Sequence, residues 1–457
     1  MLQFKHDPER LYTMKAVLLS LKVCGFKNIE KPIEIQFANK NIDDSFFTTP
    51  KVKAIYGTNG MGKSAIVFAV NTYVKSVLDR NFLAFESTRG DLCDMINKTL
   101  NYAFIDLYFA IAIDNLSRIR IFHHTINYQI HEKEVYISSE TLSYITGNYW
   151  GDVANETVVY ETSNNEIKTL YSNITEEFKN QIMENTKNLI GGSSLLLRCI
   201  GDGIDYTKSQ SDLKFSNAVL CTIIFVASIN VFIDEKDSHR MSASKIKALI
   251  ESYKSINSNS VPERNEFVID EEIDEIAEKD MKEYEKEIDK ICKFLKVFKP
   301  NLLRINIDKS PLGNGTYRCK KLLEYQNNVV VDSKYESNGI KKLIKLYPIL
   351  NNIDDGGVTF IDEFDSNIHD VYLCKLIEYF VLYGNGQLVF TTHNLGPMEV
   401  LADIDIKHSI DFINNSQISS WKKNGNYSVV NVYRSGSIPN CPFNIDASDF
   451  VRTFGGN

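Results

Sequence analysis

The stretch Gly-Thr-Asn-Gly-Met-Gly-Lys-Ser at residues 57–64 decides the fold of this chain. It has the form of a P-loop, a glycine-rich turn whose backbone N–H groups surround phosphates. In that form Lys63 reaches the terminal phosphates and Ser64 offers its hydroxyl to Mg²⁺. Glycine-rich connectors that bind nothing also occur, so the residues on either side decide between the two interpretations.

The flanking residues favour a phosphate site. Residues 52–56 are a short apolar run that predicts a buried strand, and apolar residues recur at helical spacing from Ser64 onward. A strand, a glycine turn and a helix N-terminus suit an anion, because the helix dipole and the unpaired first-turn N–H groups both face it. The sequence contains no Asn-Lys-x-Asp guanine-reading motif, which favours ATP over GTP.

A second half of the same site lies far along the chain. Residues 358–361 are an apolar strand-like run, and Asp362 and Glu363 follow directly, which is the form of a Walker B element. Strand alternation sends neighbouring side chains to opposite faces, so the two acids can do different work. We assign Asp362 to Mg²⁺ and Glu363 to polarising the attacking water. Two acids after a strand can also be a plain polar strand end, but the P-loop upstream favours the functional interpretation.

Two further segments are candidates for the site. Ser337 and Gly339 precede an apolar helix-like run, where a hydroxyl and a backbone N–H suit the γ-phosphate of a nucleotide bound on another subunit. The alternative is a helix N-cap serine beside a flexible glycine. His393 ends another apolar strand, and we predict that it is a switch histidine. His369, close after the acidic pair, could equally be a packing or capping residue.

The first part of the chain predicts strands. Residues 18–37 alternate around a polar break, which is typical of a hairpin leading toward the P-loop strand. From residue 103 to residue 161, short alternating runs joined by polar turns predict an antiparallel meander, an all-β layer beside the nucleotide-binding sheet. The most apolar run, residues 218–233, is shorter than a membrane span needs and predicts a buried core helix.

From residue 166 to residue 300 the pattern becomes mostly helical. We expect a helix over 237–254, a polar connection at 257–262, and an amphipathic helix within the charged segment 270–299. That helix either packs on its own domain or serves as a dimerisation or partner-binding arm. Strand-like alternation returns over 302–331, where we expect the catalytic fold to resume.

Composition narrows the class of protein. The chain has 457 residues, 43% of them hydrophobic and 24% charged, as in ordinary globular proteins. A formal net charge of −8 argues against a protein that coats nucleic acid through bulk positive charge, although a local basic groove stays possible. The cysteines are scattered without a metal-ligand spacing, and no secretory signal is evident, so we expect reduced thiols in a cytoplasmic protein.

The order of these motifs resembles the ABC-type ATPases of the SMC, RecF and OLD group. More narrowly, it resembles the stand-alone AAA15-type ATPases of phage defence, such as abortive-infection ATPases and the ATPase components of Septu and PARIS. The residues that carry the resemblance are the P-loop, the Ser-x-Gly element, Ile-Asp-Glu-Phe-Asp-Ser-x-Ile-His at 361–369 and Thr-Thr-His-Asn at 391–394. It covers roughly residues 18–130 and 302–395.

The resemblance implies an α/β P-loop ABC-type nucleotide-binding domain with an antiparallel β layer and a helical insertion, and a slow ATPase. It implies that two subunits meet head to tail with ATP and Mg²⁺ between them, with Asp365 beginning the D-loop. The candidate catalytic residues are Glu363, His393 and Lys63, and the candidate metal ligands are Ser64 and Asp362. The candidate nucleotide-binding residues are Gly57, Asn59, Gly60, Gly62, Lys63, Ser64, Ala65, Ser337 and Gly339. The signature-like element departs from the Leu-Ser-Gly-Gly-Gln of transporters, and no Q-loop glutamine is assigned.

We divide the chain into an N-terminal ATPase half (1–165), a helical insertion (166–300) and a C-terminal ATPase half (301–457). The segment after His393, with a strand-like run at 428–433 and a tail at 443–454, is too short for the Toprim nuclease of OLD proteins. We therefore expect a sensor or scaffold ATPase of an anti-phage system that forms a homodimer or higher oligomer and controls a separate nuclease or toxin effector. A structural assembly subunit that binds ATP and rarely turns it over is a further alternative, against which an intact Glu363 argues.

The other alternative is a RecF- or Rad50-like repair ATPase that binds DNA. Its candidate basic surface would be lined by Lys309, Arg318, Lys320, Lys321, Lys334, Lys341, Lys342 and Lys345. Charges of this kind more often form a solvated face.

Overall fold

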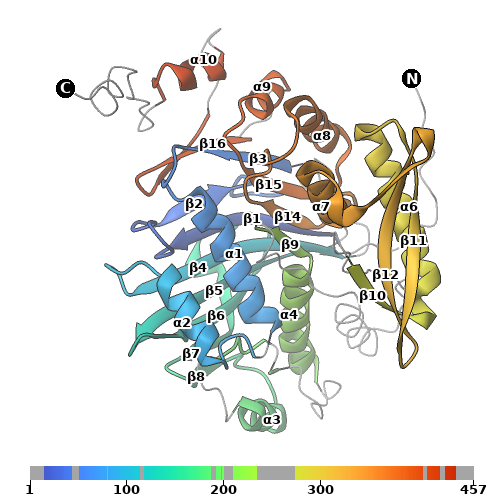
Figure 1. The fold of residues 1–457 in the computed structure, drawn as a ribbon. Coiled ribbons are helices and arrows are strands. Elements are labelled where there is room, and N and C mark those ends of the chain that lie inside the picture. The colour runs from blue at the N-terminus through green and yellow to red at the C-terminus, as the bar shows by residue number, and fades with distance from the viewer. Residues whose placement is uncertain are drawn as a thin grey trace.

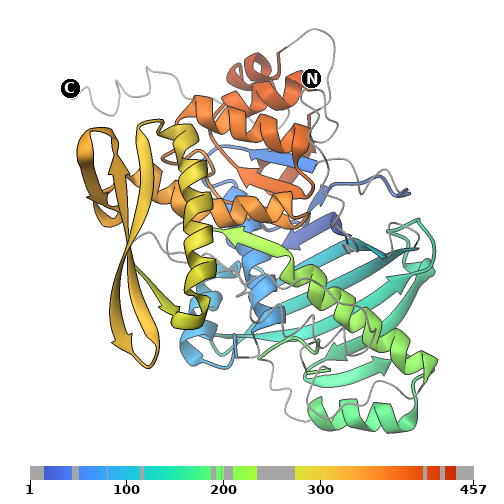
Figure 2. The same ribbon diagram turned by 90° about the vertical axis from the view of Figure 1, so that its right-hand side faces the viewer.

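The computed structural model describes residues 15–43, 51–79, 81–113, 118–186, 192–196, 198–199, 209–233, 273–404, 409–421 and 428–438. In this part of the chain the strands form three sheets, of six, seven and four strands (Figures 1 and 2). The helix expected at 237–254, the connection at 257–262 and the tail at 443–454 lie outside the described residues. The predicted α/β architecture with an antiparallel β layer is confirmed.

The six-stranded sheet lies at the centre of the molecule. Its order is β17 (Gln417–Ser420), β16 (Ile410–Asn414), β3 (Lys51–Tyr56), β15 (Gln387–Thr391), β14 (Val358–Ile361) and β9 (Ile229–Phe232). The strands from β16 to β9 run parallel, and β17 is antiparallel to β16. Parallel strands covered on both faces need apolar residues throughout, and every residue of β9, β14 and β15 is buried.

Alternation along β3 distributes its side chains between two cores. Ile55 packs with the first core, which contains α1 and α4, whereas Val52, Ala54 and Tyr56 pack with the second, which contains α7, α8 and α9. The α-helices within the described residues are α1 (Lys63–Leu78), α2 (Glu86–Met95), α3 (Glu176–Thr186), α4 (Gln210–Ala227), α6 (Met281–Phe298), α7 (Asn338–Asp354), α8 (Asp370–Tyr383), α9 (Gly396–Asp403) and α10 (Val429–Arg434). Figure 1 shows α1 and α4 on one side of the central sheet and α7, α8 and α9 on the other.

The seven-stranded antiparallel sheet covers α1 from the side away from the central sheet. Its order is β2 (Ile33–Gln36), β1 (Lys15–Cys24), β4 (Tyr102–Ile113), β5 (Arg118–His131), β6 (Glu134–Ile145), β7 (Glu156–Ser163) and β8 (Glu166–Leu170). The predicted hairpin and the predicted meander are both present. The meander has fewer and longer strands than expected, because residues 118–131 form the single strand β5.

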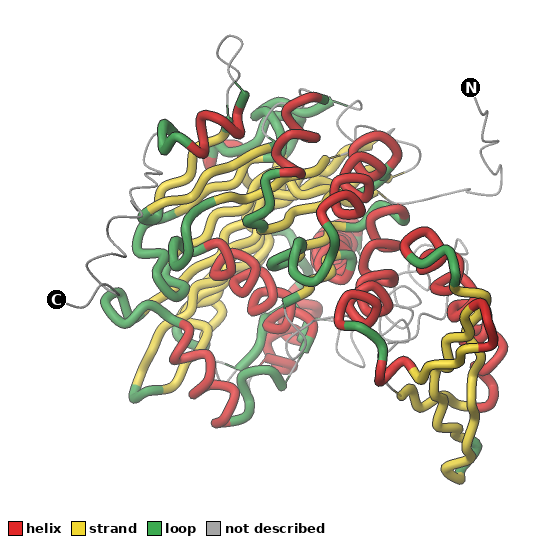
Figure 3. The backbone as a smooth tube through the Cα atoms, turned by 45° about the horizontal axis from the view of Figure 1, so that its top comes forward, coloured by secondary structure: helices red, strands yellow, loops and turns green. Residues whose placement is uncertain are grey.

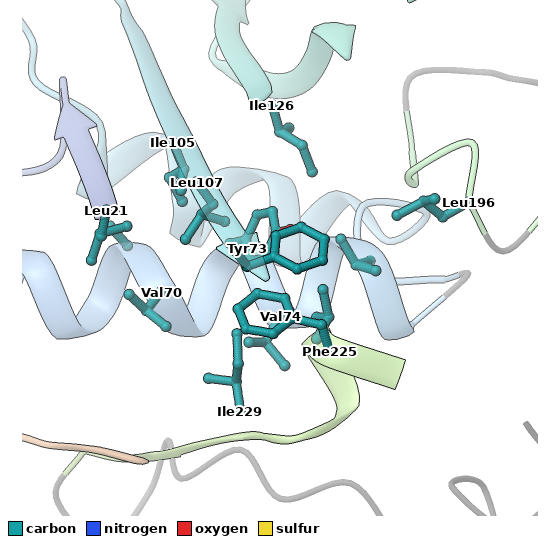
Figure 4. Close-up of a cluster of buried hydrophobic side chains, with 14 of the residues drawn as sticks. Leu21, Val70, Tyr73, Val74, Ile105, Leu107, Ile126, Leu196, Phe225 and Ile229 are labelled. Atoms are coloured by element: carbon teal, nitrogen blue, oxygen red, sulfur yellow. The ribbon is translucent and has the colours of Figure 1, made fainter. Parts of the chain in front are cut away.

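The core between the two sheets surrounds the P-loop helix. Figure 4 shows Val70, Tyr73 and Val74 of α1 among apolar side chains of the antiparallel sheet, of α4 and of β9. A buried amide also joins the two sheets, since Leu18 N donates to Gln387 Oε1 (2.6 Å) and Gln387 Nε2 donates to Leu18 O (2.9 Å). The antiparallel sheet therefore fixes the position of the helix that follows the P-loop.

The third sheet forms a small lobe with α6, visible at one side in Figures 2 and 3. It consists of β10 (Ile273–Ala277), β12 (Thr316–Tyr325) and β11 (Leu302–Gly313), with β13 (Val329–Asp332) also paired to β12. The amphipathic helix expected within 270–299 is α6, which begins only at Met281, because residues 273–277 form the strand β10. The strand-like alternation expected over 302–331 is present in β11, β12 and β13, and the chain returns to the central sheet with β14.

Two further expectations need correction. The apolar run 218–233 is helical only to Ala227 and then becomes β9, a strand of the central sheet next to β14. Residues 428–433, expected as a strand, begin the short helix α10. Both runs contain mostly apolar and β-branched residues, and a short apolar run does not by itself separate strand from helix.

Several smaller features complete the description. Short 3₁₀ helices occupy Val153–Asn155, Glu278–Asp280, Gln326–Asn328 and Ser333–Tyr335. The cysteines within the described residues are free thiols, and all but Cys374 are buried. Across the described ranges, no helix has the length and apolar character required to span a bilayer. The division of the chain at residues 165 and 300 stays a prediction.

Candidate functional site

Three of the predicted segments meet at one edge of the central sheet. β3, β15 and β14 are neighbouring parallel strands, with Ile55 paired to Thr391 and Phe390 paired to Ile361. Parallel strands present their carboxyl ends at the same edge, which is where ligands bind in open α/β sheets. The P-loop follows β3, His393 follows β15, and Asp362 and Glu363 follow β14.

The turn after β3, residues 57–62, is here called the glycine turn. Gly60 has φ 80° and Gly62 has φ 104°, conformations that glycine reaches without a steric penalty. Gly62 is the residue before α1, and a Cβ there would lie 3.1 Å from Ile29 Cγ1. At Gly57 a Cβ would lie only 2.4 Å from the backbone oxygen of Ile413. The glycines are therefore required by conformation and by space.

The glycine turn leads directly into the N-terminus of α1. Lys63 is the first residue of this helix, and its Nζ donates to Gly57 O (2.7 Å) and Thr58 O (3.2 Å). The ammonium thus lies over the turn, while the N-terminus of a long helix points into it. Ser64 and Ala65 belong to the same first helical turn, where backbone N–H groups lack intrahelical acceptors. This arrangement fits a polyphosphate.

The turn after β14, residues 362–367, is here called the acidic turn. Glu363 has φ 45°, which is uncommon for a residue with a side chain, and its side chain is exposed. The strand ends at Ile361, so the two acids do not lie on an alternating strand as expected. Glu363 instead adopts a left-handed backbone conformation directly after Asp362.

Thr391 at the end of β15 holds both acids. Its hydroxyl donates to Asp362 Oδ1 at 2.5 Å and accepts from the backbone N–H of Glu363 at 2.8 Å. Its carbonyl accepts from the N–H of Phe364 at 3.0 Å. Thr391 is fully buried, so these bonds are shielded from water. Among the described residues no donor lies within hydrogen-bond distance of the second carboxylate oxygen of Asp362, which leaves this oxygen suited to a divalent cation.

The imidazole of His393 lies within electrostatic reach of both turns. Burial lowers the pKa of His393, and the nearby ammonium of Lys63 lowers it further. Asp365, Glu363 and Asp362 act in the opposite direction, but the net shift is downward. His393 is therefore neutral near pH 7 and can donate or accept a hydrogen bond without adding charge to an anionic site.

The signature-like element occupies the N-terminus of α7. Ser337 caps this helix by accepting from the N–H of Ile340 (3.5 Å), and Ser337 and Asn338 are exposed. Gly339 lies against the acidic turn of the same chain, since a Cβ there would be 2.7 Å from Asn367 O. The capping interpretation is thus correct for the Ser337 side chain, and its exposure also leaves the helix end open to another molecule.

The remaining predicted residues divide between the site and the scaffold. His369 is a capping residue, because its Nδ1 accepts from the N–H of Val371 (3.3 Å) at the start of α8. Asn59 lies exposed on the glycine turn. Among the described residues no group of three or more His, Cys, Asp or Glu side chains could hold a metal ion by itself. A Mg²⁺ held by Ser64, Asp362 and phosphate oxygens needs no such group.

Sequence reasoning missed three residues that shape the site. Asn28, from the β1–β2 connection, donates through Nδ2 to the backbone oxygen of Gly60. Thr391 bridges the two acids, and the buried Lys342 bonds to the acidic turn. Only Thr391 carried a local signal, since it lies two residues before His393. The other two reach the site by folding and have no mark in the sequence.

One family of known proteins resembles part of the chain. Residues 229–399 match the family model described as "AAA domain, putative AbiEii toxin, Type IV TA system". This range contains β9, the acidic turn and His393. No curated protein matched the sequence.

Solved structures of ATPase proteins resemble the chain over most of its length. An Smc head domain from Pyrococcus furiosus, bound to the C-terminal domain of ScpA, aligns at TM-score 0.41 and 13% identity, covering 89% of this chain and 96% of that one. An Smc head domain from Pyrococcus yayanosii aligns at TM-score 0.38 and 13% identity, covering 89% and 97%. The recombination mediator RecF aligns at TM-score 0.36 and 12% identity, covering 89% and 99%. TM-scores below 0.5 carry no inference about activity or partners.

The residues that match the family model include one of the two turns at the edge of the central sheet. The acidic turn lies in the matched residues, and the glycine turn lies beside it on the neighbouring part of the same sheet. Residues 229–399 are similar to the AAA domains described as a putative AbiEii toxin, and this similarity supports the expected P-loop ATPase related to the abortive-infection ATPases.

Proposed function

We propose that this chain hydrolyses ATP in an assembly of two or more copies, and that its ATP state controls a separate effector protein in anti-phage defence. The observation that carries the ATPase part is the convergence of the glycine turn, the acidic turn and His393 at one sheet edge. A phosphate chain held over the glycine turn would point its terminal group toward Glu363 and His393.

Each residue has a definite task in this mechanism. Lys63 and the first-turn N–H groups of α1 bind the phosphates and neutralise their charge. Ser64 and Asp362 would hold Mg²⁺, which supplies further charge stabilisation to the phosphoryl group. Glu363 orients the attacking water, and the neutral His393 contacts the terminal phosphate or that water. Preorganised donors of this kind accelerate the reaction most, because they need no rearrangement as charge develops.

The assembly part of the proposal rests on α7. Its N-terminus is exposed at Ser337 and Asn338, and an exposed helix N-terminus attracts anions. Within one chain this end contacts the acidic turn through Gly339. We propose that Ser337 and Gly339 contact the γ-phosphate of a nucleotide bound by a second copy, so that ATP binding joins the copies.

The defence part draws on the family match. The matched family is described by a putative AbiEii toxin and a type IV toxin–antitoxin system. The proposed role in defence rests on the resemblance of the motifs to the ATPases of phage-defence systems, and the effector and the trigger belong to the same proposal. We also propose that the chain is related to the AAA15-type ATPases and that it hydrolyses ATP slowly.

The DNA-repair alternative loses support from the fate of its basic residues. Lys321 is fully buried and bonded to Asp274 at 2.8 Å, and Lys342 is buried against the acidic turn. Lys309 pairs with Glu285, and Arg318 with Glu275. Two of these side chains are buried and two are paired with acids at the surface, so the net positive surface is smaller than the sequence suggested.

The test is the hydrolysis rate of the purified protein and the mass of its native complex, for the wild type and for Glu363→Gln. We expect this substitution to lower kcat by about 100-fold or more while ATP affinity is kept, because it removes water activation only. Glu378→Gln on α8, a partly exposed glutamate paired with Lys375, is the matched control and should keep the wild-type rate.

The complex should be isolated from the native host with and without ATP. Blocked hydrolysis should trap the ATP-bound assembly, and a second protein in stoichiometric amount supports the effector proposal. A complex of this chain with DNA alone, whose affinity falls steeply with salt, would support the repair alternative instead. Wild-type hydrolysis by Glu363→Gln would overturn the assigned site.

A further inference from the structure

We infer that Lys342 of α7 is a positioning residue for Glu363: it fixes the backbone of the acidic turn and thereby couples the signature-like element to the catalytic carboxylate of the same chain. This inference rests on the proposed function, because it assumes that Glu363 activates water. Lys342 itself touches no reacting atom in this scheme.

Lys342 is buried and surrounded by oxygen acceptors of the acidic turn. Its Nζ donates to the backbone oxygen of Glu363 at 2.8 Å, to Ser366 Oγ at 3.0 Å and to the backbone oxygen of Phe364 at 3.5 Å. Its ammonium also lies 5.9 Å from the centre of the Phe232 ring. Burying a lysine is costly unless the charge is hydrogen-bonded, so these contacts are strongly favoured over alternative positions of the turn.

The other backbone groups of the turn are held from the opposite side. The N–H of Asp362 donates to Phe232 O (2.8 Å) at the end of β9, and those of Glu363 and Phe364 donate to Thr391 of β15. Neighbouring strands thus fix the N–H groups, and Lys342 fixes the carbonyl groups. Glu363 needs these hydrogen bonds, because a φ of 45° is an unfavourable backbone conformation for a residue with a Cβ.

The same helix connects this lysine to the signature-like element. Lys342 lies one turn after Gly339, which packs on Asn367 O at the far end of the acidic turn. A shift of the α7 N-terminus therefore moves Lys342 and the Asn367 contact together. Occupation of Ser337 and Gly339 by the γ-phosphate of another copy would in this way change the position of Glu363 in its own chain.

The experiment compares ATP hydrolysis by Lys342→Met with the wild type and with Lys293→Met. Lys293 is an exposed lysine on α6, so the control makes the same chemical change away from both turns. We expect Lys342→Met to lower kcat by about 10- to 100-fold, as displacement of a reacting group does, and to leave KM for ATP within about threefold. The control should keep both constants.

A double-mutant cycle then separates positioning from a general loss of structure. If Lys342 acts through Glu363, then Lys342→Met should have no further effect on single-turnover hydrolysis in the Glu363→Gln background. Equal effects of Lys342→Met in both backgrounds, or a wild-type kcat for Lys342→Met, would overturn the inference. If the wild type does not hydrolyse ATP, or if Glu363→Gln is fully active, the proposed function itself fails.

Ser366→Ala provides a milder variant in case Lys342→Met does not fold. It removes one acceptor of the lysine and leaves both backbone acceptors in place. We expect kcat to fall by about three- to tenfold with an unchanged melting temperature, because a charge-assisted hydrogen bond is lost in a partly exposed position. A wild-type kcat for Ser366→Ala in a protein whose Lys342→Met variant is unfolded would also overturn the inference.

Discussion

The glycine turn and the acidic turn lie at the same edge of one sheet and reach left-handed backbone conformations by opposite means. In the glycine turn, Gly60 and Gly62 have φ of 80° and 104°, and the residue type itself makes this possible. In the acidic turn, Glu363 and Asn367 have φ of 45° and 59°, although both carry side chains. Hydrogen bonds from β9, β15 and α7 supply what the residue type does not.

This difference shows what determines the backbone conformation of each half of the site. The glycine turn depends on missing side-chain atoms, because a Cβ at Gly57 or Gly62 would lie too close to Ile413 or Ile29. The acidic turn depends on partners distant in sequence, Thr391 and Lys342 above all. The first turn should therefore be sensitive to substitution within itself, and the second to substitution of its partners.

The largest expected effect is that of Gly62→Ala. Alanine at this position would have to adopt φ 104°, and its Cβ would lie 3.1 Å from Ile29 Cγ1 and 3.3 Å from Asn28 Oδ1. The turn must therefore move. Displacing the backbone N–H groups should weaken ATP binding by about 100-fold, because they surround the phosphates. Calorimetric titration of the wild type and variant with ATP measures this effect.

Gly315→Ala is the control for backbone strain alone. Gly315 has φ 69° in the β11–β12 turn, and nothing lies within 4 Å of a Cβ placed there. We expect it to lower the free energy of unfolding by about 1 kcal/mol and to leave ATP affinity unchanged. If Gly62→Ala binds ATP as the wild type does, the glycine turn does not depend on its missing atoms.

Thr391→Val tests the partners of the acidic turn. It keeps the shape of the side chain but leaves the buried N–H of Glu363 and Oδ1 of Asp362 without the hydroxyl. We expect the free energy of unfolding to fall by about 1–3 kcal/mol and kcat to fall by roughly tenfold or more. Urea unfolding and steady-state hydrolysis measure the two effects. Thr391→Ser should restore both, and a fully active Thr391→Val would show that the turn is held without it.

If the two turns determine catalysis, a substitution far from them should lower stability without lowering the hydrolysis rate. His123 of the antiparallel sheet allows us to test this. Burial alone would lower the pKa of His123, but hydrogen bonds to Asp106 and Glu156 raise it to about 9. A folded pKa above the unfolded value of about 6.5 means that the stabilisation is complete below pH 6.5 and is lost as pH rises through 9.

We therefore expect His123→Gln to lower the free energy of unfolding by roughly 2 kcal/mol at pH 6 and by much less at pH 10. Urea unfolding at the two pH values measures the difference, and hydrolysis at pH 7 should stay within about twofold, because His123 lies in the antiparallel sheet away from both turns. An equal loss of stability at both pH values would show that the charge of His123 contributes nothing.

The same contrast explains which parts of the structure were predictable from sequence. The glycine turn, its strand and its helix could be recognised locally, because phosphate binding requires residue types that few other structures require. The carboxyl ends of β14 and β15 followed from apolar runs that end in polar residues. The left-handed conformation of Glu363 could not be foreseen, since its causes are Thr391 and Lys342, and neither adjoins it in the chain.

Errors in the fold have a related physical origin. Residues 229–232 were expected within a core helix, because an apolar run buried on all sides satisfies a helix and a parallel strand equally well. Ile273 and Ile276 fitted the periodicity of the following helix, but their backbone pairs with β12. Pairing between distant strands overrides local periodicity in such segments.

The smallest expected effect is that of Asn367→Gly in the acidic turn. Glycine adopts φ 59° without strain, and the backbone oxygen against Gly339 is kept. We expect the free energy of unfolding to change by no more than about 0.5 kcal/mol, because relief of strain is offset by greater freedom of the unfolded chain. Hydrolysis should stay within about twofold, with Asn327→Gly, at φ 70° in the turn between β12 and β13, as a matched control. A large loss of kcat from Asn367→Gly alone would mean that the Asn367 side chain takes part in the reaction, and that the acidic turn depends on its own residue types as the glycine turn does.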